Sequence, residues 1–174
     1  MPKIIENIRE KLLEEAKRQV MEEGYSSMTI RSVAKACSVG VGTVYNYFSS
    51  KEMLVAGFML EDWMQCKEAF EKGCNAATEP RTALESIYLE LHKFMEKYDT
   101  LFSDESAENS FARSFQQRHT MLRRQIAEPL LTWAKKKNSS NPEFLAEFLA
   151  ESMLTWILAG TDFEQIAEIL LQLL

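Results

Sequence analysis

The segment from residue 24 to residue 51 contains no acidic residue, although the chain of 174 residues carries a formal net charge of −6. Its basic residues are Arg31, Lys35 and Lys51. Thr43, Tyr45 and Tyr47 add closely spaced hydroxyl groups, which can donate hydrogen bonds to phosphate oxygens. In an acidic protein, a segment free of carboxylates is typical of a surface that binds a polyanion, and DNA is the obvious candidate.

Three helices must position these side chains. Apolar residues recur at helical spacing near the N-terminus, so the first helix is predicted over about residues 3–23, ending at Gly24. The second begins after Thr29, a residue type suited to a helix N-cap, and turns its apolar side inward. The third covers about residues 41–48, after an interruption at residues 38–40.

The third helix has two different sides. Val44 and Phe48 lie four positions apart and are expected to pack it against the first helix. Val41, Thr43 and Asn46 then share the opposite side. The sequence therefore predicts a small helix with a buried edge and a free edge.

A fourth helix is predicted to begin at a capping box. Ser49 would accept a hydrogen bond from the amide of Glu52, and the Glu52 carboxylate would bond back to Ser49. Lys51 then lies in the first helical turn, where free amides and the helix dipole favour an anion.

Two short helices joined by a tight turn form a helix-turn-helix, which alone is a weak signal. The longer run VAKACSVGVGTVYNYFSSKEML is more specific, and it resembles the N-terminal domain of the TetR/AcrR family of transcriptional regulators, over roughly residues 5–55. The resemblance implies sequence-specific binding to double-stranded DNA. Phosphate contacts are implied for Thr29, Thr43, Tyr47 and Lys51, and base contacts for Val41, Thr43 and Tyr45 or Asn46. Arg31 and Lys35 fit either DNA contacts or ordinary solvated positions.

The chain departs from the family pattern at two positions. Ser38 stands where the turn normally has glycine, and Gly40 stands where serine normally caps the third helix. Replacing a serine cap by glycine lowers helix stability by only about a few tenths of a kcal/mol. A serine in the left-handed conformation is mildly strained. The fold is therefore expected to tolerate both departures.

The rest of the chain is also predicted to be helical, because only six Gly and four Pro are spread along it. The predicted fold is all-α, with about nine helices. A three-helix DNA-binding domain over residues 1–50 is followed by a helical effector and dimerisation domain over residues 51–174. The charge is uneven: six acidic residues and no basic residue follow Lys137.

The C-terminal 32 residues favour a two-fold homodimer. Twenty of the residues from 143 to 174 are apolar, more than one core-facing stripe needs. An apolar surface of this extent marks an association site. The predicted interface residues are Phe148, Ser152, Trp156, Ile166, Leu170 and Leu173. The alternative is that both terminal helices merely complete the core.

A small-molecule pocket is predicted in the C-terminal domain, where bulky side chains from several helices converge. The predicted lining residues are Trp63, Phe70, Tyr88, His92, Phe94, Phe111, Phe115 and Trp133. An apolar or amphipathic effector would suit them. Because the fourth helix begins at Lys51 and continues past Trp63, an effector that tilts it would alter DNA binding. The same residues fit a solid core equally well.

Other classes of protein are poorly supported. The sequence has no HExxH, GxSxG or glycine-rich phosphate loop, so no enzyme, metal or cofactor is predicted. Its three cysteines lack zinc-site spacing and are expected to be reduced. A charged N-terminus and the absence of a long apolar run predict a cytoplasmic protein with no membrane partner. The remaining alternative is a helical protein-interaction module without DNA readout.

Overall fold

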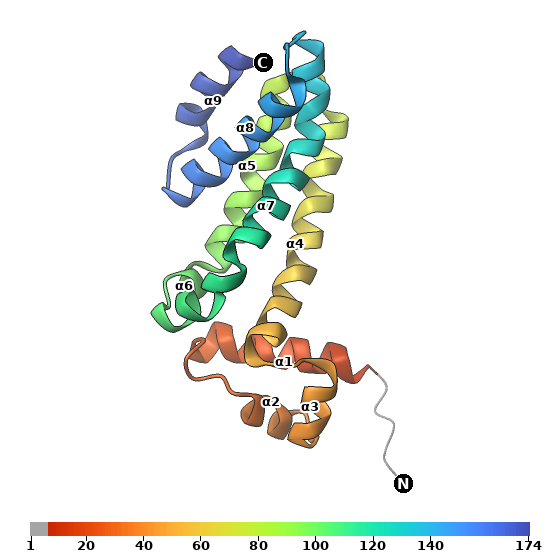
Figure 1. Cartoon of the computed structure of the whole chain (residues 1–174), viewed down its shortest axis with the longest axis vertical. Helices are drawn as coiled ribbons and strands as arrows, with labels where there is room; N and C mark the ends of the chain where they lie inside the picture. The colour runs from red at the N-terminus through yellow and green to blue at the C-terminus, as the bar shows by residue number, and fades with distance from the viewer. Residues whose placement is uncertain (1–6) are drawn as a thin grey trace. The chain divides into compact units, whose positions relative to one another are not determined.

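The computed structural model describes residues 7–174, without the side chains of residues 108, 109 and 112–117 (Figure 1). Every regular element within that range is a helix, which confirms the all-α fold. The helices are α1 (Ile8–Glu23), α2 (Ile30–Ala36), α3 (Val41–Tyr47), α4 (Lys51–Ala76), α5 (Pro80–Lys97), α6 (Asp99–Phe102), α7 (Glu105–Lys136), α8 (Pro142–Leu158) and α9 (Phe163–Leu173). The part of helix one that is predicted over residues 3–6 lies outside the described residues.

The chain forms two compact units. Unit 1 contains Met1–Asp62 and Tyr98–Arg113, and unit 2 contains Trp63–Lys97 and Ser114–Leu174. The helices α4 and α7 each begin in unit 1 and end in unit 2. These units are defined by packing and do not test the predicted boundary at residue 50 between a DNA-binding domain and an effector domain, which stays a prediction.

One side of α1 lies in the core of unit 1. It buries Leu12, Leu13, Ala16 and Val20, which follow each other at helical spacing. The short helix α2 packs against α1 and α3, and its apolar side is buried as predicted, with Ile30, Val33 and Ala34 in the core. Figure 1 shows α2 and α3 side by side next to α1.

The helix ends mostly follow the predicted signals. Gly24 has a φ of 87°, and Thr29 caps α2 by accepting from the Ser32 amide at 3.0 Å. Ser38 adopts the left-handed conformation with a φ of 56°, and Gly40 begins α3 without a side-chain cap. Both departures from the family pattern are therefore accommodated as expected.

The predicted cap of α4 is wrong by one residue. Ser50, not Ser49, accepts a hydrogen bond from the amide of Met53 at 3.2 Å. A capping side chain reaches amides two or three positions ahead. Because α4 begins at Lys51, only Ser50 stands at the required distance from a free amide.

A buried carboxylate joins three segments of unit 1. Asp62 of α4, which is 9% exposed, accepts from Lys17 Nζ at 2.7 Å and from Tyr98 Oη at 2.6 Å. Burial and the hydrogen bond to Asp62 raise the pKa of Tyr98, so its hydroxyl remains a donor. This cluster ties α1, α4 and the start of α6 together.

In unit 2, α5 packs against both α8 and α9. One side of α5 is buried, with Leu84, Ile87 and Leu91 fully enclosed. Burial raises the pKa of the Cys66 and Cys74 thiols to about 12, as suits small side chains in a core. Among the described residues, no helix is both long enough and apolar enough to cross a membrane.

Close packing of α4 on α1 predicts that Gly57→Ala destabilises the protein. A Cβ at Gly57 would lie 2.7 Å from Leu13 Cδ2 and 3.1 Å from Phe48 Cε1, so buried side chains would have to shift. We expect the free energy of unfolding to fall by about 1–3 kcal/mol in urea denaturation. Gly42→Ala is the matched control, because nothing lies within 4 Å of its added Cβ. An unchanged stability in Gly57→Ala would contradict the close approach of the two helices.

The buried carboxylate predicts a second stability effect. Tyr98→Phe removes a donor from Asp62 while keeping the ring, so we expect a loss of about 1.5–3 kcal/mol in the free energy of unfolding. Tyr47→Phe removes a hydroxyl from an exposed ring and should leave stability within about 0.5 kcal/mol of wild type. Equal effects of the two substitutions in urea denaturation would show that the Asp62 cluster is not stabilising.

Candidate nucleic-acid interface

The helix α3 keeps almost nothing in the core. Val44 is its only buried residue, and Phe48 is buried directly after its end. Tyr45 and Tyr47 are 52% and 47% exposed. Asn46 is also exposed, whereas Val41 and Thr43 are half-buried. The two exposed tyrosines thus do not serve the core, and their rings and hydroxyls are free to meet a partner.

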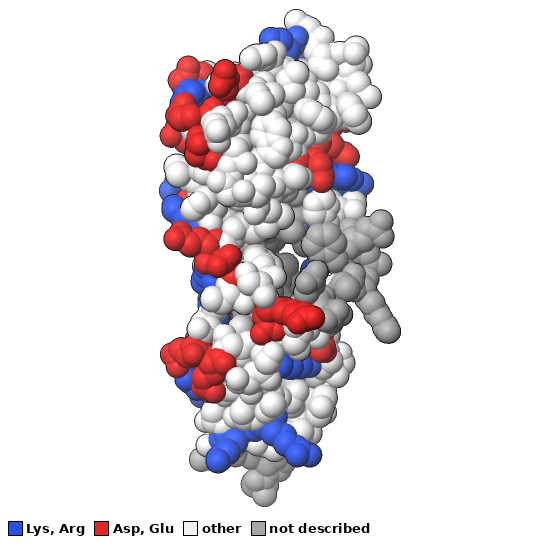
Figure 2. Space-filling view, turned by 90° about the vertical axis from the view of Figure 1, so that its left-hand side faces the viewer, with Lys and Arg blue, Asp and Glu red and all other residues white. Residues whose placement is uncertain are grey.

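The neighbouring α2 adds exposed residues on the same part of unit 1. Thr29, Arg31 and Lys35 are all exposed. On the face seen in Figure 2, the charged side chains nearest the end where α2 and α3 lie are basic. The exposed residues of the acid-free segment 24–51 thus contribute basic and neutral side chains, and no carboxylate, to the surface of unit 1.

Lys51 points into a contact within unit 1. Its ammonium group donates a hydrogen bond to the carbonyl oxygen of Tyr25 and lies 3.9 Å from the centre of that ring. Desolvation lowers the pKa of Lys51. The side chain fastens the loop between α1 and α2 in this structure, and its implied phosphate contact stays a prediction.

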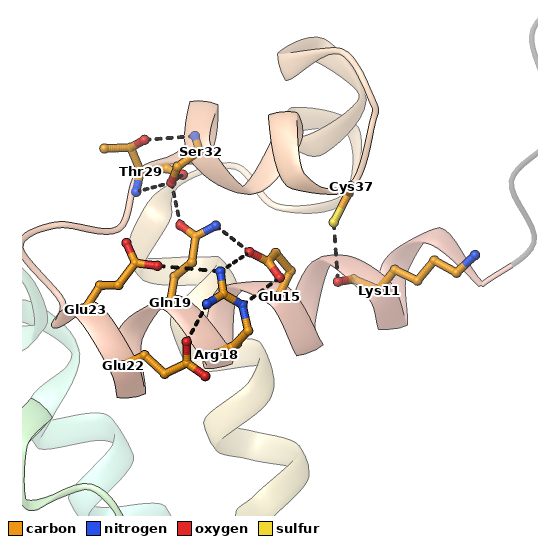
Figure 3. A network of polar contacts seen from close by, with 9 residues as sticks. All are labelled: Lys11, Glu15, Arg18, Gln19, Glu22, Glu23, Thr29, Ser32 and Cys37. Carbon is orange, nitrogen blue, oxygen red and sulfur yellow. Dashed lines mark hydrogen bonds and ion pairs between the residues drawn. The ribbon is translucent and has the colours of Figure 1, made fainter.

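A polar network, which the sequence analysis did not single out, connects α1 to the first turn of α2 (Figure 3). Gln19 of α1 is only 3% exposed. Its Oε1 accepts from Ser32 Oγ at 2.5 Å, and its Nε2 donates to Glu15 Oε1 at 2.7 Å. The sequence does carry a signal for it, because Gln19 is a polar residue on the otherwise apolar side of α1, three positions after Ala16.

Arg18 holds the acidic end of this network. Its Nε and Nη2 donate to the two carboxylate oxygens of Glu15, at 3.1 and 2.8 Å. It also donates to Glu22 and lies 3.5 Å from Glu23. The hydrogen bond from Arg18 is the main cause that lowers the pKa of Glu15, which favours the ionised carboxylate further. The charges of the α1 carboxylates nearest α2 are thus partly neutralised.

The predicted pocket residues fall into separate groups. In unit 2, the Trp63 ring lies 6.1 Å from Phe70 and 5.5 Å from Phe94 between ring centres. Trp63 Nε1 donates to Gln125 Oε1 at 2.7 Å. Trp133 is buried in α7. These buried aromatic residues fit the core reading as well as the pocket reading.

The other predicted pocket residues lie elsewhere. Tyr88 stacks near His92 and Phe163 on the part of α5 that meets α9, with ring-centre distances of 5.6 and 5.4 Å. Phe111 belongs to unit 1, where its ring lies 5.8 Å from Tyr25. The side chain of Phe115 lies outside the described residues. The described residues of this set thus fall into separate groups of ring contacts, and a shared pocket stays a prediction.

The predicted dimer residues divide between surface and core. Phe148 and Leu173 are exposed, and Ser152 and Trp156 are half-buried. Ile166 and Leu170 correct the prediction, because both are 0% exposed in the core beneath α9 and offer no surface to a partner. Further exposed apolar residues of α8 and α9 are Phe144, Leu158 and Ile169. Figure 2 shows an uncharged area over these helices, with acidic side chains beside it.

Comparison with known proteins agrees with this arrangement. Residues 12–57 match the family model described as "Bacterial regulatory proteins, tetR family". The HTH-type transcriptional regulator UidR of Escherichia coli (strain K12) is 33% identical over 54 residues, and the match spans 31% of this chain and 28% of the relative. The match to UidR from Shigella flexneri has the same extent. The family model thus covers most of α1, all of α2 and α3 and the start of α4, and the matches to UidR span less than a third of either chain.

Solved structures show that the fold extends over nearly the whole chain. The fatty acid degradation regulator FadR from Bacillus halodurans has a TM-score of 0.64 at 18% identity, covering 95% of this chain and 93% of its own. A TetR/AcrR-family regulator from Thermobifida fusca has a TM-score of 0.63 at 16% identity, covering 94% and 96%. Residues 12–57 are thus similar to the tetR family of bacterial regulatory proteins, and the fold of the chain is similar to that of solved TetR/AcrR-family regulators.

Proposed function

We propose that the protein is a sequence-specific DNA-binding transcriptional regulator that reads double-stranded DNA with α3. One observation carries the proposal: α3 buries only Val44 and leaves Tyr45, Asn46 and Tyr47 exposed in a segment without acidic residues. A recognition helix needs this division, because its side chains must reach base edges in the major groove while the scaffold holds it by one edge.

The remaining contacts follow from position. Val41, Thr43, Tyr45 and Asn46 lie on α3 and are assigned to the bases. Thr29 and Arg31 at the beginning of α2, together with Tyr47 and Lys51, are assigned to phosphates. To reach a phosphate, Lys51 would have to leave the carbonyl of Tyr25. Phosphate contacts would supply a salt-dependent part of the affinity, and base contacts would supply selectivity.

The regulator acts as a two-fold homodimer on a palindromic operator in this proposal, and most simply as a repressor in the cytoplasm. Exposed apolar side chains on α8 and α9 support a self-association surface, with Phe148 and Leu173 among them. A two-fold axis would present two α3 helices to successive major grooves, about 34–36 Å apart or a multiple of that distance.

An effector site in unit 2 is also part of the proposal. The buried ring cluster of Trp63, Phe70 and Phe94, with the polar side chain of Gln125 beside it, is suited to an apolar or amphipathic compound. The helix α4 runs from Lys51 past this cluster, so a compound that shifts the helix would change DNA binding. The fold similarity to FadR does not carry that regulator's role in fatty acid degradation to this chain.

A helical protein-interaction module without DNA readout is the second candidate. Exposed apolar residues on α8 suit such a module. It offers no reason for two half-exposed tyrosines in a segment free of carboxylates, so DNA binding explains more of the molecule.

Two single substitutions separate the roles assigned to phosphate and base contacts. Arg31→Ala should weaken binding to selected and random duplexes by a similar factor, and it should reduce the slope of log affinity against log salt by about 0.9. Thr43→Ala should weaken binding to the selected duplex more than binding to a random one. Fluorescence anisotropy, with a duplex selected by the wild-type protein from a random pool, measures both effects.

Arg81→Ala is the matched control for Arg31→Ala. Arg81 is an exposed arginine of unit 2 that pairs with Glu164, and its loss changes the net charge equally. It should leave the slope against salt unchanged. If Arg31→Ala and Thr43→Ala both kept wild-type affinity for every duplex, α2 and α3 would not be the DNA-binding surface.

The proposed dimer predicts that Phe148→Glu yields monomers. A carboxylate at a side chain that is 47% exposed in the protomer would be buried against the partner copy, which opposes association. Light scattering at micromolar concentration should give the protomer mass for this variant and twice that mass for wild type. Leu89→Glu on α5, at a residue that is 48% exposed, is the control and should stay dimeric. A monomeric wild-type protein would refute the dimer.

A further inference from the structure

Gln19 carries the strongest further inference, because it is a nearly fully buried polar side chain on the helix that supports the helix-turn-helix. It is 3% exposed and lies on α1, so it does not reach solvent or DNA itself. A buried amide is costly unless its hydrogen bonds are satisfied. Both of its polar atoms have partners, one on α1 and one on α2.

The hydrogen-bond partners of Gln19 fix the orientation of its side-chain amide. Glu15 is ionised and held by Arg18, so its oxygens can only accept hydrogen bonds. The Gln19 amide must therefore turn its Nε2 toward Glu15, which leaves its Oε1 facing Ser32. The Glu15 carboxylate, which Arg18 holds in place, thus determines which end of the Gln19 amide is presented to α2.

Ser32 connects Gln19 to the start of α2 by hydrogen bonds. Its hydroxyl lies 2.5 Å from Gln19 Oε1 and can donate to it, with the Thr29 carbonyl at 2.8 Å as a second acceptor, and its Oγ accepts from the backbone amide of Thr29 at 3.0 Å. The Thr29 side chain accepts in turn from the Ser32 amide at 3.0 Å. The start of α2, which includes Thr29 and Arg31, is thereby connected to α1 by a chain of hydrogen bonds through Ser32 and Gln19 (Figure 3).

We propose that Gln19 is a positioning residue for DNA recognition, which sets the placement of α2 on α1 and so the selectivity of the helix-turn-helix. This inference rests on the proposed DNA-binding function. It assigns Gln19 no contact with DNA. Its removal should therefore affect the discrimination between duplexes, which depends on exact placement, more than the electrostatic attraction common to all duplexes.

Gln19→Met is the principal test variant. Methionine is also unbranched and is a good helix former, and the substitution leaves the net charge unchanged. The Ser32 hydroxyl can then turn to its second acceptor, the Thr29 carbonyl at 2.8 Å, so the cap of α2 is retained. The variant is thus expected to fold with α2 less firmly placed.

Affinity is compared for two probes, at a temperature where circular dichroism shows each variant fully folded. One probe is the duplex that wild-type protein selects from a random pool, and the other is poly(dI-dC). Gln19→Met should bind the selected duplex about tenfold more weakly, as the loss of one hydrogen bond can do. Its binding to poly(dI-dC) should change by less than about twofold, because no phosphate contact is removed.

Substitutions of Ser32 test the same hydrogen bond between Ser32 and Gln19, and they replace the Gln19→Met experiment if that variant does not fold. Ser32→Ala should lose selectivity, whereas Ser32→Thr retains the hydroxyl and should restore it. Since Gln19 acts through Ser32, the double variant Gln19→Met, Ser32→Ala should be no less selective than Ser32→Ala alone.

The outcomes separate this inference from the proposed function. A wild-type protein that prefers no duplex over poly(dI-dC) would overturn the proposed function, and the inference would fall with it. A selective wild-type protein whose Gln19→Met variant keeps its preference within about twofold would overturn the inference alone. The inference would also be overturned if the double variant lost selectivity by the product of the two single losses, because Gln19 and Ser32 would then act independently.

Discussion

The arrangement of α2 and α3 depends on the burial of one side of α1. Leu12, Leu13, Ala16 and Val20 give that helix a continuous apolar side, and each large aliphatic residue contributes about 1.5–3 kcal/mol when it is buried. The short helices α2 and α3 have seven residues each and would not be stable in isolation. The helix α2 packs against both α1 and α3, and α3 itself buries only Val44, so its tyrosines stay exposed. The geometry of the proposed DNA-binding surface thus depends on α1, through α2, as well as on α3 itself.

Polar contacts add direction to this apolar support. On one part of α1, Gln19 joins the first turn of α2 through Ser32. On another, Lys17 joins Asp62 of α4 and, through it, Tyr98. Apolar packing tolerates small shifts of a helix, whereas a buried hydrogen bond has a narrow range of length and angle. The buried polar groups of unit 1 therefore specify where the helices lie, in addition to stabilising them.

The sequence predicted this fold well wherever a local signal decided the structure. Thr29, Gly24 and Ser38 each occupy the backbone position that was expected from residue type and spacing. The cap of α4 was misplaced by one residue because Ser49 and Ser50 carry identical side chains, and only the actual start of the helix chooses between them. Sites built by distant segments were harder to predict. Ile166 and Leu170 share the apolar pattern of an interface, and periodicity does not distinguish a partner copy from the protomer's own α5.

The central claim is that α3 contacts DNA, and hydroxyl-radical footprinting of the five tyrosines, read by mass spectrometry, tests it most directly. Tyr45 and Tyr47 should be modified readily in the free protein and protected when the selected duplex is added. Buried Tyr25 and Tyr98 are internal controls and should be modified slowly in both states. The account would be contradicted if the duplex bound while Tyr45 and Tyr47 remained as reactive as in the free protein, because α3 would then be outside the contact surface.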